Sequence, residues 1–108
     1  MNNVDKAITN ALKQVGQDKL MVNFCLEQSL TDIISDKRVQ FVNDYEEVEV
    51  RSEVMNKPTY MDLALFVNKQ IVDAQDDHHV FLEDIYPLGI ENENTDNEVH
   101  LYAYALGS

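Results

Sequence analysis

Two stretches of the chain carry apolar side chains at helical spacing. In residues 3–15 and 59–75 the apolar positions recur three or four residues apart, which is the period of an amphipathic helix. The stripe of the second stretch consists of Tyr60, Leu63, Ala64, Val67 and Ile71. Thr59 and Asp62 stand at the two positions of a capping box, with Asp in place of the usual Glu. The pattern therefore predicts a helix over each stretch.

Residues 18–36 allow two interpretations. A dense apolar cluster runs from Leu20 to Leu26, and further apolar residues follow up to Ile34. Periodicity does not separate a buried strand from a helix over so few residues. We favour one helix, because Gly16 before it resembles the corner of a helical hairpin. The alternative is a strand over 19–26 followed by a short helix.

Alternating side-chain patterns predict the strands. In residues 46–54, Val48, Val50 and Val54 alternate with charged residues, which indicates a half-buried strand. Residues 79–86 and 98–106 are two further predicted strands, in which successive side chains would point to opposite faces, and the polar run between them predicts a loop over 87–97. These two strands should pair as an antiparallel hairpin. A shorter strand is expected at 39–42.

The order of these elements predicts one α+β domain over residues 1–108, which is a typical domain length. We expect two N-terminal helices, a central helix and a small, mainly antiparallel sheet that ends in a C-terminal β-hairpin. The small side chains of strand 98–106, such as Ala103 and Ala105, are expected to face the helices. Tyr102 and Tyr104 on the other side would then be partly exposed.

The distribution of charge adds the main functional signal. The formal net charge is −12, and the whole surplus lies after residue 40, where only Arg51, Lys57 and Lys69 are basic. So many negative charges repel one another and destabilise the compact state. Because they are present despite this cost, we expect them to bind a basic partner. Direct nucleic-acid binding is not expected, because that requires a basic footprint. Solvation of the surface is the alternative explanation of the acids.

Eleven residues form the candidate partner-binding set, which consists of acids from three segments and the two exposed tyrosines. They are Glu47, Glu49, Glu53, Glu83, Asp84, Glu91, Glu93, Asp96, Glu98, Tyr102 and Tyr104. On a regular strand, acids two residues apart would stand roughly 7 Å apart, a spacing of the same order as successive phosphates. Glu47, Glu49 and Glu53 would form such a row on the strand predicted over 46–54. A row of this kind predicts docking on a protein surface that otherwise binds nucleic acid.

Catalysis and metal binding are not expected. His78 and His79 are adjacent, and a strand would point them to opposite faces. His100 is expected opposite Glu83 or Asp84, where it would form a charged pair. Cys25 lies in an apolar cluster and is expected to be buried and inert. A small metal-dependent enzyme that uses His78, His79 and His100 is the third and least favoured hypothesis for the function.

The remaining features favour a cytoplasmic protein without a cofactor. The chain has one cysteine, no signal-peptide pattern and no apolar run of the roughly 20 residues needed to span a bilayer. The sequence predicts a non-enzymatic protein that docks on a basic protein surface, as an inhibitor, an immunity protein or a DNA mimic. Such proteins are common in phages and mobile elements. A homo-oligomer, such as a homodimer, with a structural or accessory role is the alternative.

Overall fold

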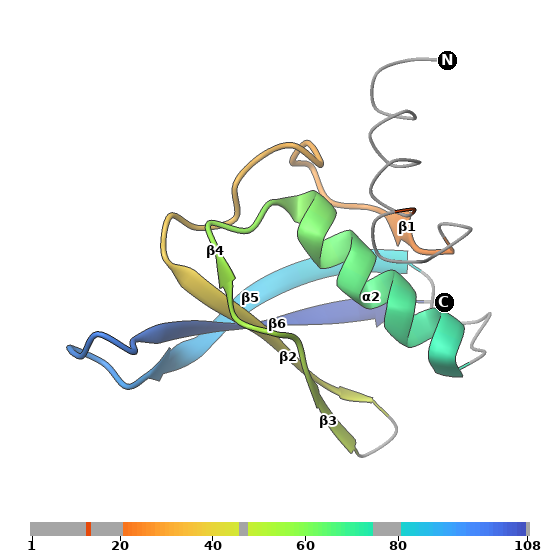
Figure 1. Cartoon of the computed structure of the whole chain (residues 1–108). Coiled ribbons are helices and arrows are strands. Elements are labelled where there is room, and N and C mark those ends of the chain that lie inside the picture. Colours follow the sequence, from red (N-terminus) through yellow and green to blue (C-terminus); the bar gives the residue numbers. More distant parts are fainter. Residues whose placement is uncertain (1–12, 14–20, 46–47, 75–80, 108) are drawn as a thin grey trace.

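One helix lies across one face of a six-stranded mixed sheet (Figure 1). The computed structural model describes residue 13 and residues 21–45, 48–74 and 81–107. The strands run in the order β1-β5-β6-β2-β3, and β4 also pairs with β2. The elements are β1 (Asn23–Phe24), β2 (Arg38–Tyr45), β3 (Val48–Arg51), β4 (Met55–Asn56), α2 (Tyr60–Ala74), β5 (Phe81–Glu91) and β6 (Val99–Gly107). This confirms a small α+β domain.

The sheet is mixed, so the expectation of a mainly antiparallel sheet was wrong. β1 pairs parallel to β5, and β2 pairs parallel to β6, whereas β5 and β6 form the expected antiparallel hairpin. A parallel pair needs a crossover connection. The chain makes that crossover between β2 and β6, because it passes through α2 on the way.

The central helix confirms its sequence pattern closely. Its first turn is capped as expected: the Thr59 N–H donates to the Asp62 carboxylate at 2.8 Å, and the Asp62 N–H donates to the Thr59 hydroxyl at 3.3 Å. All five residues of the predicted stripe are buried. Leu63, Ala64, Val67 and Ile71 share one cluster with Val39, Phe41 and Leu82, which the sheet contributes with no exposed surface. Tyr60 packs edge to face on Phe24. The helix and the sheet therefore share one apolar core.

The expected helix over residues 18–36 is not found in its described part, because residues 21–36 contain no α-helix. The apolar cluster instead runs extended, and β1 pairs with the first residues of β5. The Cys25 N–H donates to the carbonyl of Leu82 at 2.9 Å. The Cys25 side chain is exposed, so its expected burial was also wrong. The helix predicted over 3–15 lies outside the described residues, apart from Lys13.

The side of β6 that faces α2 is the opposite of the one predicted. Tyr104 is only 2% exposed and lies in the core, and Tyr102 is half-buried against it. The Tyr104 ring meets Phe66 of α2 edge to face at 6.0 Å, and Phe66 stacks with Phe41. The large aromatic side chains fill the space beneath the helix. The prediction that the alanine side faces the helix and leaves these tyrosines exposed was wrong.

The C-terminal hairpin is longer than expected. β5 continues through Pro87 to Glu91, where the sequence predicted a loop. Proline lacks an N–H donor and is tolerated on an edge strand or at a bulge. β5 offers both, since β1 pairs only with Phe81 and Leu82 and the register shifts between Pro87 and Gly89. No helix among the described residues is long and apolar enough to cross a membrane.

Candidate interaction surface

The hairpin of β5 and β6 projects past the rest of the described chain and ends in the turn 92–98 (Figure 1). Hydrogen bonds within the turn hold its shape. The N–H and the hydroxyl of Thr95 both donate to the Asn92 carbonyl, at 3.2 and 2.6 Å, and the Asn94 N–H donates to the Glu98 carboxylate at 2.9 Å. Asn92 and Asn94 adopt positive φ, which Asn tolerates better than most residues. The turn is thus organised before any partner arrives.

Four acids of the candidate set surround this turn: Glu91, Glu93, Asp96 and Glu98. The hydrogen bond from the Asn94 N–H, followed by that from His100, lowers the pKa of Glu98. Glu93 and Asp96 form no side-chain ion pair with any residue that the structure describes. The Arg38 guanidinium lies nearby and donates to the backbone carbonyl of Asp96 at 3.2 Å, but the two carboxylates themselves form no ion pair with a described residue.

Exposed apolar side chains lie on β5 directly beside these acids. Leu88 is 52% exposed, Ile90 is 40% exposed and Tyr86 is 44% exposed. Within the described chain, β5 has β1 as its neighbour only at its first two residues, so this part of the strand is open on its outer edge. We call the set of Leu88, Ile90, Glu91, Glu93, Asp96 and Glu98 the hairpin tip. It combines aliphatic area with carboxylates on one projecting element.

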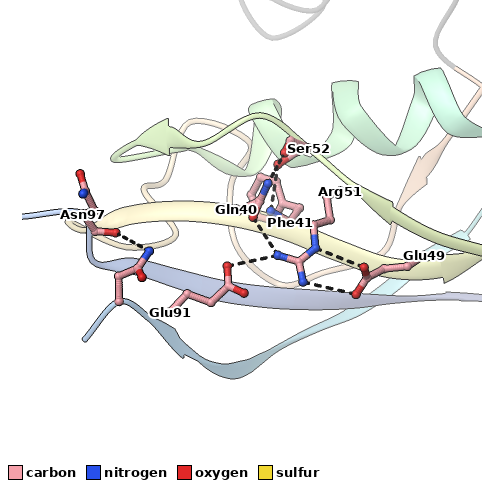
Figure 2. Close-up of polar contacts among 8 residues, drawn as sticks. Gln40, Phe41, Glu49, Arg51, Ser52, Glu91 and Asn97 are labelled. Carbon is pink, nitrogen blue, oxygen red and sulfur yellow. Dashed lines mark hydrogen bonds and ion pairs between the residues drawn. The ribbon is translucent and has the colours of Figure 1, made fainter. Parts of the chain in front are cut away.

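Arg51 neutralises part of the acidic surplus. Figure 2 shows its guanidinium between two carboxylates: Nε lies 3.3 Å from Glu49 Oε2, and Nη1 lies 3.2 Å from Glu91 Oε1. Nη1 also donates to Gln40 Oε1 at 3.3 Å. The hydrogen bond to Glu49 is the main cause that raises the pKa of Arg51. Two members of the candidate set are therefore already paired within the protein.

The other hairpin acids lie far from the tip. Glu83 lies so close to Gly107 that a Cβ at that glycine would collide with its carboxylate, and Asp84 is opposite Ala105. Eight steps along β5 lead from Glu83 to Glu91, which corresponds to about 26 Å at the rise of an extended strand. The acids that the candidate set takes from the hairpin therefore lie in two groups, one at each end of the hairpin.

The predicted row of acids on residues 46–54 is interrupted as well. Glu47 lies outside the described residues, and β3 ends at Arg51 before Glu53. Val48 is 63% exposed and Val54 is 40% exposed, whereas Ser52 is buried. The expected alternation, with these valines inside, was therefore wrong. A regular spacing that imitates phosphates does not extend through this segment.

The histidines do not assemble a site in the described chain. His100 lies opposite Ile90, and its Nε2 contacts Glu98 Oε1 at 2.9 Å. The expected pairing of His100 with Glu83 or Asp84 was wrong, because β5 continues for five residues beyond the predicted end of the strand. His78 and His79 lie outside the described residues. Among the residues that are described, no group of three or more His, Cys, Asp or Glu side chains could hold a metal ion.

The sequence missed the aliphatic part of the tip. Leu88 and Ile90 alternate along the chain as strand residues do, but they were assigned to the loop over 87–97 that the polar run predicted. That alternation is the signal that pointed to an extended strand. Comparison with protein-family models, with curated proteins and with solved structures finds no match to this chain.

Proposed function

We propose that this protein is a non-enzymatic binding protein whose hairpin tip docks on a basic surface of another protein. The observation that carries the proposal is the exposure of Leu88 and Ile90 on the strand that leads into the turn with the exposed residues Glu93 and Asp96. Exposed aliphatic area bordered by polar groups is typical of protein interaction sites. The partner surface should therefore offer an apolar depression surrounded by Lys or Arg.

The physical roles of the two residue types differ. Burial of the aliphatic side chains supplies affinity, whereas the carboxylates steer the encounter and select a basic partner. The hydrogen bonds of Thr95 and Asn94 hold the turn in shape, so little conformational entropy is lost on docking. Tyr104 takes no part in this proposal, because it belongs to the core.

An inhibitor or an immunity protein fits this mode of docking, since either blocks a basic site by occupying it. A DNA mimic is a narrower version that requires carboxylates beyond the tip. The proposal includes a cytoplasmic setting and excludes a cofactor and direct contact with nucleic acid or membrane. Self-association through α2 is the alternative, with Val72, which is 47% exposed, as its apolar contact.

The proposal is tested by affinity capture from a lysate of the source cells at low and at high ionic strength. Wild-type protein is compared with Glu93→Lys/Asp96→Lys and with Leu88→Ser/Ile90→Ser. The control variant Glu27→Lys/Asp73→Lys changes the net charge by the same amount away from the tip. We expect one basic protein to be retained at low salt by the wild type and the control and lost with both tip variants.

Three results would contradict docking by the tip. The first is retention of the same partner by both tip variants, and the second is equal loss with the control variant, which would indicate only an effect of net charge. The third is a stable dimer in light scattering that Val72→Asp dissociates while the tip variants leave it intact. That last result would support the homo-oligomer instead.

A further inference from the structure

A groove of about 470 Å³ lies between α2 and the chain that joins β3 to β4. Its apolar lining consists of Met55, Leu65 and Phe66, and polar side chains border it. This volume is within the range of roughly 300–1,000 Å³ that is typical of binding pockets. The groove belongs to neither the hairpin tip nor the candidate set, apart from Glu53 on its border.

The strand wall of the groove contains a β-bulge. Between the pairs Val42–Arg51 and Val39–Met55, β2 contributes two residues and the facing chain contributes three. Ser52 anchors the bulge: its N–H donates to the Phe41 carbonyl at 2.8 Å, and its hydroxyl oxygen accepts from the Phe41 N–H at 2.9 Å. The wall is therefore held in place by buried hydrogen bonds.

The free edge of β3 continues this wall. Hydrogen-bonded and non-hydrogen-bonded pairs alternate along an antiparallel ladder. Since Ser52 bonds to Phe41, the backbone N–H and C=O groups of Glu49 and Arg51 point away from β2. In the described part of the chain, β2 is the only neighbour of β3. Two outward-facing residues, two positions apart, form the pattern to which an added strand can pair.

The charge around the groove favours a basic occupant. Both of its cations are engaged, Arg51 with Glu49 and Glu91, and Lys69 with Asp73 at 3.4 Å. Glu53 is exposed and forms no ion pair with another described residue. The surroundings therefore retain surplus negative charge, and a cationic segment is attracted whereas an acidic one is repelled.

We propose that an extended segment of another protein adds to the edge of β3 and places an apolar side chain in the groove. Its backbone pairs with Glu49 and Arg51, its apolar residue packs on Met55, Leu65 and Phe66, and a neighbouring Lys or Arg lies beside Glu53. This second site is distinct from the hairpin tip, and the ion pair of Arg51 with Glu91 connects the two. A protein with both sites binds a folded basic surface at the tip and an extended basic segment beside β3.

The probe for this proposal is a short, fluorescein-labelled peptide of alternating lysine and leucine, followed by fluorescence anisotropy. Leu65→Glu places a charge in the apolar lining, and Gln70→Trp fills the groove from its border. We expect each variant to weaken binding at least about tenfold, the loss expected when one buried apolar contact is removed. Val72→Glu adds the same charge to an exposed position of the same helix and should leave the affinity unchanged.

Two further peptides separate strand addition from simple charge attraction. An N-methylated version of the probe lacks the backbone donors that pair with β3, and an alternating glutamate and leucine peptide reverses the charge. Both should bind at least about tenfold more weakly than the probe. Binding should also protect the amide hydrogens of Glu49 and Arg51 from exchange.

The proposal is overturned if the N-methylated peptide binds as tightly as the probe, or if the glutamate peptide does. It is also overturned if the Glu93→Lys/Asp96→Lys variant loses the probe while Gln70→Trp retains it, since binding would then belong to the tip. Circular dichroism establishes that each variant is folded. Should Leu65→Glu fail to fold, Gln70→Trp together with the N-methylated peptide still decides the outcome.

Discussion

At the scale of single residues, the buried Asn68 joins the helix to the N-terminal part of the described chain. It has no exposed surface, and its Oδ1 accepts hydrogen bonds from the N–H groups of Met21 and Val22. In Asn68→Leu both N–H groups lose their acceptor at a buried site. We expect the free energy of unfolding to fall by about 1–3 kcal/mol or more, measured by urea denaturation.

Lys69→Leu is the matched control for that change, because it inserts the same side chain at the next, exposed position. It should alter the free energy of unfolding by less than about 0.5 kcal/mol. If both variants unfold at the same urea concentration, the tether through Asn68 contributes nothing to stability.

Tyr104 makes stability depend on pH in the alkaline range. Burial raises its pKa from 10.0 to about 12, although a hydrogen bond with Asn43 lowers it slightly. The unfolded chain therefore loses this proton near pH 10, whereas the folded protein keeps it until about pH 12. The contribution of Tyr104 to the free energy of unfolding is fully present below pH 10. It is lost as the pH rises from about 10 to about 12, and the total loss is up to roughly 3 kcal/mol.

Tyr104→Phe should remove most of this decline, which is measured by urea denaturation at a series of alkaline pH values. Tyr86→Phe is the control, because Tyr86 is 44% exposed, and it should keep the wild-type profile. An unchanged alkaline decline in Tyr104→Phe would assign the effect to other groups. Tyr60, whose pKa burial also raises, is the first of these to examine.

At the scale of the elements, the capping box shows that a short sequence can determine the end of a helix. Thr59 and Asp62 exchange hydrogen bonds at 2.8 and 3.3 Å, and neither needs a distant partner for them. We expect Thr59→Ala to destabilise the protein by about 0.5–2 kcal/mol in thermal or urea unfolding. Asp73→Ala at the other end of α2 should have little effect, because it removes only an exposed pair with Lys69. Equal effects of the two variants would contradict the role of the cap.

The hairpin shows which strand boundaries could be predicted from the sequence and which could not. The alternation in residues 98–106 predicted β6 to within one residue at each end. Its partner strand was predicted to end before Pro87, because the polar run that follows it predicted a loop over 87–97. Whether proline is tolerated depends on its lying at an open edge or a bulge, and that is a property of the sheet. The aliphatic half of the hairpin tip was lost from the prediction for this reason.

At the scale of the whole molecule, the net charge of −12 sets the response to salt. Mutual repulsion of the carboxylates opposes folding, and added salt screens it. We therefore expect the urea midpoint of the wild type to rise with sodium chloride concentration. Glu93→Lys/Asp96→Lys removes two negative charges and adds two positive ones, so its midpoint should rise less steeply. If the urea midpoints of the wild type and the variant rose equally with sodium chloride concentration, the salt would act by a mechanism other than screening of charge.

The sequence by itself determined the features that depend on local period and local hydrogen bonds. These are the helix α2 with its cap and buried stripe, the presence of β6, and the acidic surplus after residue 40. Each arises within a few residues, where spacing alone decides which side chains share a face. The candidate acids were predicted as residue types in the same way, and Glu93 and Asp96 do lie exposed at the hairpin turn.

Only the tertiary structure decided how these pieces meet. Residues 21–26 became extended because β5 and Asn68 supply their hydrogen bonds, and Tyr104 faces α2 because the space beneath that helix accepts an aromatic ring. The pairing of Arg51 with Glu91 likewise joins residues that lie far apart in the chain. Long-range contacts of this kind depend on the available space and on the partners that folding brings together, and neither is encoded in the period of a short segment.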